Sequence, residues 1–339
     1  MRLVVDGFGK FIGVKGETIV VKENGKTITR IQPTDLEQVI ISGKGGVSTD
    51  ALRLLAENGV DVLIVDFRGE VIAILMSPMM KTVSTRREQY LAFKDKRGVK
   101  IAREIVRAKV QNQKAVLYTL AKRRIDTQPE AAEKLYSAAN KMEELLDEIA
   151  LIDGDIVDEV RNDLLNLEGR AAQNYWEAAS VLLNSLNFKG RSGRYATDPA
   201  NSMINYGYGI LTGEVWRAVH YAGLDPYGGF LHTDKPGKPS MVLDLMEEFR
   251  PHVVDKFIFK LVARKMISSE GFENIDGICQ MRDDTRRTFL EEFLSELGSS
   301  VRLGESKLNW SEVILHQARQ LAKFLRGELR DYEGFTQYW

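Results

Sequence analysis

The chain has 339 residues, of which 44% are hydrophobic and 28% charged, and its formal net charge is −1 at pH 7. Such a composition is typical of a water-soluble globular protein, and the length predicts two domains. No apolar run approaches the roughly 18 residues of a membrane span, so we expect no membrane association. Cys279 is the single cysteine, which excludes an internal disulfide and fits a reducing compartment. The apolar stretch at the N-terminus is interrupted by Asp6 and Gly7 and is too short for a signal peptide, so we expect a cytoplasmic protein.

Residues 1–77 predict a small β-rich domain. The β-branched runs 18–22 and 27–31 flank Asn24-Gly25, and Asn-Gly is the strongest short signal for a β-hairpin. Further strands are expected over 36–42, 60–65 and 70–76, with one short helix over 48–58. The glycine-rich segment 43–49 lacks the lysine and the glycine spacing of a phosphate-binding loop, and we interpret it as a turn.

The sequence pattern changes from β-strands to helices near Pro78. We therefore expect a linker over 78–85 and an all-α domain over 86–339. A long helix over 99–124 carries Lys100, Arg103, Arg107 and Lys114 within a sector roughly 60° wide. We call these four residues the basic stripe. Residues 81–124 hold 14 Lys and Arg against 3 Asp and Glu. The stripe therefore predicts contacts with DNA phosphates, although a solvated basic face would have the same pattern.

The following segment has the opposite charge and ends at a candidate site residue. Residues 126–168 hold 13 Asp and Glu against 3 Lys and Arg, which predicts a helix that faces away from DNA. At its end, Glu168 lies among small residues, so a closely packed helix can hold this carboxylate in the interior. Taken alone, a glutamate is usually at the surface.

A flexible basic loop over 189–194 contains Arg191 and Arg194, which could grip phosphates. A helix then begins at Asp198-Pro199 and carries Asn201 and Tyr208. These two side chains could orient DNA, but helix capping and core packing explain them equally well.

The segment 231–251 places His232 in a loop broken by proline and glycine, before a helix that begins near Ser240. Asp244 and Glu247 are three residues apart on that helix and are within reach of a common ligand. One imidazole with carboxylates suits Mn²⁺ or Mg²⁺, because oxygen ligands dominate. An ordinary amphipathic helix with acids on its solvent face would have the same spacing.

Further helices are expected over 253–267, 283–297 and 310–326. The chain then ends in an aromatic tail, which we interpret either as a partner contact or as a frayed end, and which comprises Tyr332, Phe335, Tyr338 and Trp339.

Several separated motifs, in this order, resemble the CRISPR-associated spacer-integration endonuclease family, the integrase of CRISPR adaptation. The resemblance covers essentially the whole chain. It rests on Leu167-Glu168-Gly169, Asp198-Pro199-Ala200-Asn201, the tyrosines at 206 and 208, the segment 223–232 and the segment 243–251.

The resemblance implies an α+β fold with a β-rich dimerisation domain and a larger α-helical catalytic domain. It implies that Glu168, His232 and Glu247 are metal ligands and catalytic residues, with Asp244 behind them as a supporting residue. Glu247 stands where many members have aspartate. The implied reaction inserts protospacer DNA into a CRISPR repeat by attack of a 3′-hydroxyl on a phosphodiester, with Mn²⁺ or Mg²⁺ as cofactor. Nuclease activity on double-stranded and branched DNA would use the same site. The implied assembly is a homodimer that binds a small companion adaptation protein.

The residues alone are also compatible with two other functions. A metal-dependent phosphoesterase for a small substrate would need a closed pocket and would not use the basic stripe. A non-catalytic DNA-binding scaffold would keep the stripe and would bind equally well without metal.

Overall fold

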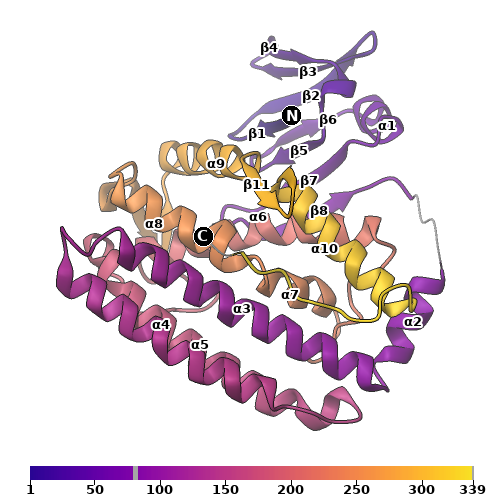
Figure 1. The fold of residues 1–339 in the computed structure, drawn as a ribbon. Helices are drawn as coiled ribbons and strands as arrows, with labels where there is room; N and C mark the ends of the chain where they lie inside the picture. Colours follow the sequence, from indigo (N-terminus) through magenta and orange to yellow (C-terminus); the bar gives the residue numbers. More distant parts are fainter. Residues whose placement is uncertain (79–82, 338–339) are drawn as a thin grey trace.

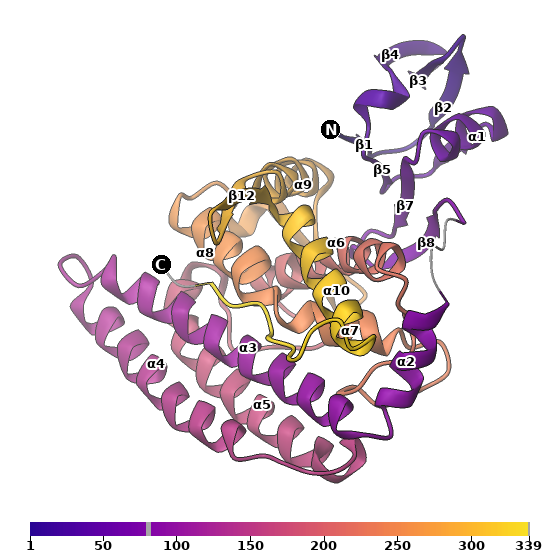
Figure 2. The same cartoon turned by 45° about the vertical axis from the view of Figure 1, so that its right-hand side comes forward.

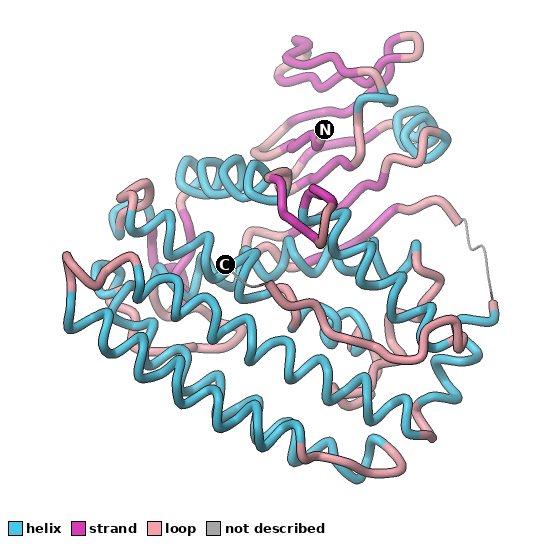
Figure 3. Tube along the Cα trace, viewed as in Figure 1, coloured by secondary structure: helices cyan, strands magenta, loops and turns pink. Residues whose placement is uncertain are grey.

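The structure, a computed structural model, describes residues 1–78 and 83–337. Strands gather in the N-terminal part and helices make up most of the rest, as the tube in Figure 3 shows. This confirms the predicted fold class, a β-rich domain followed by a mostly helical one.

The N-terminal part forms two four-stranded sheets. In the first, β1 (Arg2–Val5), β5 (Gln38–Ile41) and β7 (Asp61–Val65) are parallel, and β8 (Val71–Leu75) joins β7 antiparallel at the edge. The second sheet has the order β4-β3-β2-β6, with bounds Lys26–Ile31, Thr18–Glu23, Lys10–Lys15 and Gly45–Val47. The turn between β3 and β4 has positive φ at both Asn24 and Gly25, as the Asn-Gly signal predicts.

A separate hydrophobic core holds these sheets together. Residues from both sheets, such as Ile12, Ile19 and Val39, pack with Leu55 of α1 (Thr49–Glu57). Ser48 caps this helix, because its hydroxyl accepts a hydrogen bond from the backbone N–H of Ala51 at 3.2 Å. A short 3₁₀ turn, η1 (Pro33–Asp35), precedes β5.

Three long helices form one side of the helical part. They are α3 (Lys96–Lys122), α4 (Pro129–Ala150) and α5 (Val157–Ala179), and they run side by side in Figures 1 and 2. The helix α2 (Ser84–Ala92) leads into them and begins inside the segment expected to be a linker; residues 79–82 of that segment lie outside the described residues.

The remaining elements cover the other side of α3. They are α6 (Pro199–Tyr221), α7 (Ser240–Glu247), a π-helical turn η4 (Arg250–Asp255), α8 (Lys256–Ala263), α9 (Asp283–Leu297) and α10 (Trp310–Leu325), with short 3₁₀ turns η2 (Ser180–Leu182), η3 (Asn184–Leu186) and η5 (Ser269–Gly271). Two hairpins that the helical prediction did not include also lie here, β9–β10 (Phe272–Ile275 and Ile278–Met281) and β11–β12 (Ser300–Leu303 and Ser306–Asn309). No helix in the described ranges combines the length and the apolar character that crossing a lipid bilayer requires.

The two parts of the chain are in close contact through α6. Gly209 allows the backbone of α6 to approach the turn before β8, since a Cβ at Gly209 would lie 1.9 Å from the carbonyl oxygen of Gly69. Asp61 of β7 accepts hydrogen bonds from Arg217 at 2.7 Å and from Tyr221 at 2.9 Å. These contacts fix the edge strand β8 beside the helical part, where it lines the cleft described below.

The C-terminal segment after α10 packs against the helices over its described length. Tyr332 and Phe335 are buried, and the backbone N–H and C=O groups near Phe335 bond to side chains of α3 and of residue Glu248. The interpretation of this tail as frayed or exposed to a partner is therefore wrong for Tyr332 and Phe335. Tyr338 and Trp339 lie outside the described residues.

Candidate active site

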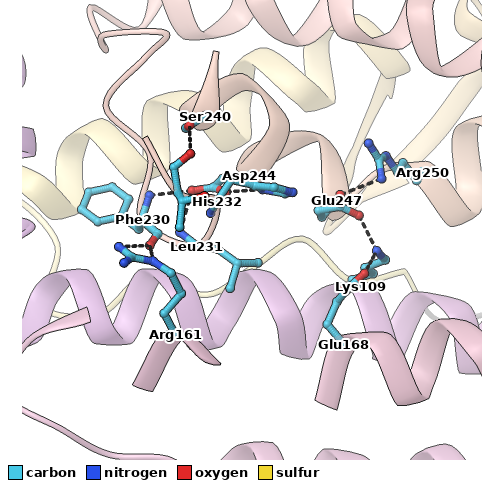
Figure 4. A network of polar contacts seen from close by, with 11 residues as sticks. Lys109, Arg161, Glu168, Phe230, Leu231, His232, Ser240, Asp244, Glu247 and Arg250 are labelled. Atoms are coloured by element: carbon cyan, nitrogen blue, oxygen red, sulfur yellow. Dashed lines mark hydrogen bonds and ion pairs between the residues drawn. The ribbon is translucent and has the colours of Figure 1, made fainter. Parts of the chain in front are cut away.

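Glu168 and Glu247 meet at one residue of α3, and His232 is bonded to Asp244, one turn before Glu247 on α7. Glu168 comes from the middle of α5, Glu247 from the last turn of α7, and His232 from the loop before α7. Lys109 of α3 lies between the two glutamates, as Figure 4 shows. The sequence thus predicted three of the residues at this point and missed the lysine.

His232 is held in place by Asp244, which is fully buried on α7. One Asp244 oxygen lies 2.7 Å from Nδ1 of His232 and accepts a hydrogen bond from the His232 backbone N–H at 2.9 Å. The other oxygen accepts hydrogen bonds from the N–H groups of Phe230 and Leu231, at 2.6 and 2.9 Å. All these contacts fasten the loop to α7. They are those of a residue that orients the histidine, because an Nδ1–H given to Asp244 leaves Nε2 as the basic nitrogen.

Glu168 and Glu247 meet at the ammonium group of Lys109. Nζ of Lys109 contacts Oε1 of Glu168 and lies 2.6 Å from Oε2 of Glu247. Arg250 approaches the other Glu247 oxygen at 2.7 Å. Glu247 is 3% exposed on its side chain and Glu168 is 22% exposed, so the pair is buried at one end and open to solvent at the other.

The charges in this cluster stabilise one another. Burial alone would raise the pKa of Glu247, but Arg250 and Lys109, together with His232, outweigh it and lower the pKa. Burial alone would lower the pKa of Lys109, but Glu247 and Glu168 outweigh it and raise the pKa. Glu247 therefore stays ionised and Lys109 stays protonated at neutral pH, and the carboxylate is available to a cation.

Lys109, Glu168 and Arg250 of this cluster line a large open cleft with a volume of about 1790 Å³, and Glu247 lies behind them. The walls come from β8, α5, α6, α7 and the loop 188–194, and the cations that line it are Arg68, Lys109, Lys189, Arg191, Arg194, Lys238 and Arg250. Two of the predicted DNA-binding arginines, Arg191 and Arg194, are among them. Such a cleft attracts a polyanion.

Arg191 and Tyr208 form part of one buried group at the wall of this cleft. The guanidinium of Arg191 lies over the rings of Trp176 and Tyr208, 5.6 Å from each centroid, and that of Arg250 lies 4.6 Å from the Tyr208 centroid. The hydroxyl of Tyr208 donates a hydrogen bond to Asp255 at 2.7 Å. Burial raises the pKa of Asp255 to about 6. Tyr208 thus presents its ring to two arginines, while Arg194 pairs with Glu70 at 2.7 Å and stays exposed.

Asn201 lies elsewhere and holds the loop in shape. It is fully buried, its amide donates hydrogen bonds to Gly190 at 2.8 Å and to Asp198 at 2.6 Å, and its carbonyl oxygen accepts from Arg191 and from the backbone of Ser192. Asn201 therefore cannot orient DNA by direct contact, because both polar atoms of its side chain form hydrogen bonds within the protein. The alternative interpretation, helix capping and packing, holds for this residue.

The basic stripe faces away from the cleft. Lys109 lies roughly 150° around α3 from the middle of the stripe, at 100° per residue. None of the four stripe residues lines the cleft. Each contacts a group of the same chain: Lys100 the carboxylate of Asp331, Arg103 the carbonyl of Ile152, Arg107 the carboxylate of Glu104, and Lys114 that of Glu143. DNA contact by the stripe stays a prediction, and in this structure its four side chains contact groups of the same chain.

Lys109 and Arg250 are the residues of this cluster that the sequence analysis missed. One signal for Lys109 was available, since Ile105 and Val106, four and three residues before it, place it on the buried side of α3. A lysine in such a position is buried and needs a carboxylate partner. Arg250 follows Glu247 by one helical turn, a spacing at which opposite charges pair.

The donor set fits a divalent cation in its chemistry. Oε2 of Glu247 is buried and, apart from its ion contact with Lys109, forms no hydrogen bond with any described group. Glu168 faces it across the ammonium, so two carboxylates already enclose a positive charge. Among the described residues, however, no three His, Cys, Asp or Glu side chains are arranged around a single point as metal ligands. Holding an ion would therefore require Lys109 to leave the space between the glutamates.

Solved structures share this fold over the whole chain. One is a casposase bound to an integration product, with a TM-score of 0.84, 25% identity, and coverage of 100% of this chain and 94% of that one. Another is a Cas1 protein from Thermotoga maritima, with a TM-score of 0.79, 19% identity, and coverage of 99% and 100%. The architecture is therefore the Cas1 fold.

The sequence comparisons show the family itself. The family model for CRISPR associated protein Cas1 matches residues 3–295. A CRISPR-associated endonuclease Cas1 of Archaeoglobus fulgidus is 46% identical over the full length of both chains. One of Korarchaeum cryptofilum is 32% identical, covering 96% of this chain and 95% of its own length. The chain belongs to the Cas1 family.

Proposed function

We propose that this protein is a metal-dependent DNA endonuclease and integrase of CRISPR adaptation. The observation that carries the proposal is the pairing of Glu168 and Glu247 at Lys109 beside a cation-lined cleft, with His232 oriented by Asp244, one helical turn before Glu247 on α7. The names of relatives support the reaction class, since curated relatives are called endonucleases and the casposase structure holds an integration product.

Glu168, Glu247 and Nε2 of His232 would hold the metal, with Mn²⁺ or Mg²⁺ as the expected ion. When bound, such an ion polarises a phosphodiester and offsets the negative charge that develops during displacement. Arg250 keeps Glu247 ionised, and Asp244 keeps His232 in the tautomer that presents Nε2. Lys109 holds the two carboxylates together in this structure and would have to leave the space between them for an ion to bind there.

The cleft residues would place the DNA. Arg191 and Arg194 are positioned to contact phosphates, and the Tyr208 ring supports Arg191 and Arg250 from behind. The nucleophile would be a protospacer 3′-hydroxyl in integration and water in nuclease action. We infer, in addition, that the protein acts as a homodimer with a small companion adaptation protein. Complexes of a Cas1-containing protein with Cas2 among the structures of the same fold support this last inference.

The shape of the cleft favours DNA over a small phosphoester. Pockets for small ligands typically hold 300–1,000 Å³ and enclose most of the ligand, whereas this cleft has a volume of about 1790 Å³ and is open to solvent. Two facing carboxylates repel unless a cation lies between them, and a protein that only binds DNA has no need of such a pair beside the cleft.

Strand transfer tests the proposal. A short duplex with 3′-hydroxyl ends would be incubated with a supercoiled plasmid that carries a CRISPR repeat, with Mn²⁺, Mg²⁺ or a chelator, and with or without the companion protein. Glu247→Gln and His232→Ala should abolish joined products. The matched control is Glu177→Gln, since Glu177 lies on the same helix as Glu168 and lines the same cleft. Full activity in chelator, or in the two site variants, would contradict the proposal. Metal-dependent cleavage of small phosphoesters without DNA processing would favour the phosphoesterase.

A further inference from the structure

A second hollow lies where the C-terminal end of α3 meets α8, an end of the helical part that Figure 1 shows away from α2. Its volume is about 380 Å³. Five basic side chains line it, together with one acidic side chain, Glu296 of α9. The basic residues are Arg123, Arg124, Lys256, Lys260 and Arg264. We call this hollow the α3–α8 pocket.

The basic residues converge from two elements. Lys256, Lys260 and Arg264 follow one another at intervals of four residues and therefore share one face of α8. Arg123 and Arg124 follow the last turn of α3. Phe257 and Phe259 supply apolar lining between the two groups. The chain thus folds two separate basic runs toward one concave surface.

Positive charge is in excess in the α3–α8 pocket. Glu296 pairs with Lys260 at 2.6 Å, and no other carboxylate is among its lining residues. Burial, together with the neighbouring charges of Arg123 and Lys260, lowers the pKa of Lys256 to about 8 against the opposing effect of Glu296. Burial and Arg123 also lower the pKa of Arg124. The fold therefore holds like charges close together, and an anion bound among them would offset the repulsion.

We propose that the α3–α8 pocket is a binding site for backbone phosphates of DNA, separate from the cleft of the candidate active site. The proposal rests on the proposed function, because it takes DNA as the source of the phosphates. The spread of the cations favours a polymer over a single phosphate ion. From Lys256 to Arg264 the helix rises by roughly 12 Å, a length that spans several successive phosphates at about 3.4 Å per nucleotide.

The position of the pocket also suits a strand that extends beyond the active site. Phe259, which lines the α3–α8 pocket, packs against Trp176 with ring centroids 6.3 Å apart, and Trp176 lines the main cleft. One aromatic layer thus separates the two. DNA that continues past this wall reaches a second set of cations.

The test is DNA binding by a double charge reversal, Arg123→Glu with Arg264→Glu. Both side chains are exposed, so the variant should fold. The control is Lys141→Glu with Lys323→Glu, which changes the charge equally at exposed positions of α4 and α10 outside both hollows. Dissociation constants would be measured over a range of salt concentrations, with one duplex that only fills the cleft and one that is several turns longer.

The pocket variant should bind the long duplex more weakly than the control does, and the slope of log K against log salt should fall by about one for each lost phosphate contact. Binding of the short duplex should be unchanged. Equal slopes in pocket and control variants would overturn the proposal. The proposal would also be overturned if the pocket variant kept its DNA affinity and lost only the binding of inorganic phosphate. The same holds if the variant lost only the binding of the companion protein.

These outcomes differ from a failure of the proposed function. Strand transfer with the short duplex depends on the candidate active site and not on the pocket. The pocket variant should therefore keep this activity. If the wild-type protein joined no DNA under any condition, the proposed function would fail, while the salt slopes would still decide whether the pocket binds DNA.

Discussion

Asp244 uses both of its carboxylate oxygens to hold His232 and the two residues before it, with its Oδ1 2.7 Å from Nδ1 of the histidine. These contacts hold the segment between His232 and Asp244, which are twelve residues apart, as a compact loop against α7. The histidine can direct only Nε2 toward Glu247 and Glu168, which is the arrangement that a metal ligand needs.

Replacement of Asp244 by asparagine should weaken metal binding more than it weakens folding. With its one acceptor oxygen toward Phe230 and Leu231, the asparagine keeps those two backbone hydrogen bonds, but its amide nitrogen then faces His232 and no longer selects the Nδ1–H tautomer. We expect metal affinity to fall by about 10- to 100-fold. The measurement is the Mn²⁺ concentration that gives half-maximal strand transfer, and excess Mn²⁺ should restore part of the activity. An unchanged requirement for Mn²⁺ would contradict the positioning role.

Replacement of Lys109 by methionine should make the protein depend on metal for stability. The variant leaves Glu168 and Glu247 facing each other without a cation, which should cost about 3–5 kcal/mol without metal, because it breaks a buried ion pair. Mn²⁺ no longer competes with an ammonium, so it should raise the melting temperature of the variant more than that of the wild type. Lys100→Met, which removes a cation of the same helix that pairs with Asp331, is the control. A smaller Mn²⁺ effect in Lys109→Met than in this control would speak against the shared site.

The cleft and the basic stripe should differ in their effect on DNA binding. Arg194→Glu places a negative charge at the cleft and should weaken DNA binding and its salt dependence. Arg103→Glu changes the charge on the face of α3 that contacts the end of α4, and should leave affinity within a factor of about two, because screening is strong at that distance. A larger loss from Arg103→Glu than from Arg194→Glu would return the DNA path to the stripe.

Asp255 should make stability depend on pH. Its pKa is raised to about 6 by burial, against the opposing effects of Tyr208, Arg191, Tyr175 and Arg250. The folded protein therefore binds this proton more tightly than the unfolded chain, and the contribution of Asp255 to stability falls as pH rises from about 4 to about 6, by about 3 kcal/mol in total. The measurement is the free energy of unfolding by denaturant between about pH 4 and pH 6. With increasing pH it should fall more, or rise less, for the wild type than for Asp255→Asn. Parallel curves would show that Asp255 titrates normally.

The C-terminal segment should support the active site through Glu248. This buried carboxylate accepts hydrogen bonds from the Tyr332 hydroxyl at 2.5 Å and from the Phe335 N–H at 2.7 Å, and it directly follows Glu247. Tyr332→Phe removes one of these bonds and should cost about 1–3 kcal/mol of stability. If the segment positions Glu247, kcat should fall while KM for DNA stays constant. Tyr118→Phe, at an exposed position of α3, should change neither. A Tyr332→Phe variant with wild-type kcat would limit the segment to a structural role.

The sequence predicted those parts of the structure that local signals determine. Asn24-Gly25 specifies its hairpin through positive φ angles, and the spacing of apolar residues specifies the long helices. The basic stripe shows the limit of such signals, because helical periodicity shows that residues share a face but not what that face contacts. Asp331 and Glu143, which pair with stripe residues, are 231 and 29 residues away from their partners along the chain. The same limit explains why Lys109 was missed, since its partners lie on two other helices.

The central claim is that Glu168, His232 and Glu247 hold one divalent cation together. Calorimetric titration of the protein with Mn²⁺, without DNA, tests it most directly, with Glu168→Gln, Glu247→Gln and the control Glu177→Gln. The account predicts one Mn²⁺ site per chain in the wild type and in Glu177→Gln, and a large loss of affinity in each of the other two variants. Wild-type affinity in Glu168→Gln and Glu247→Gln would contradict it.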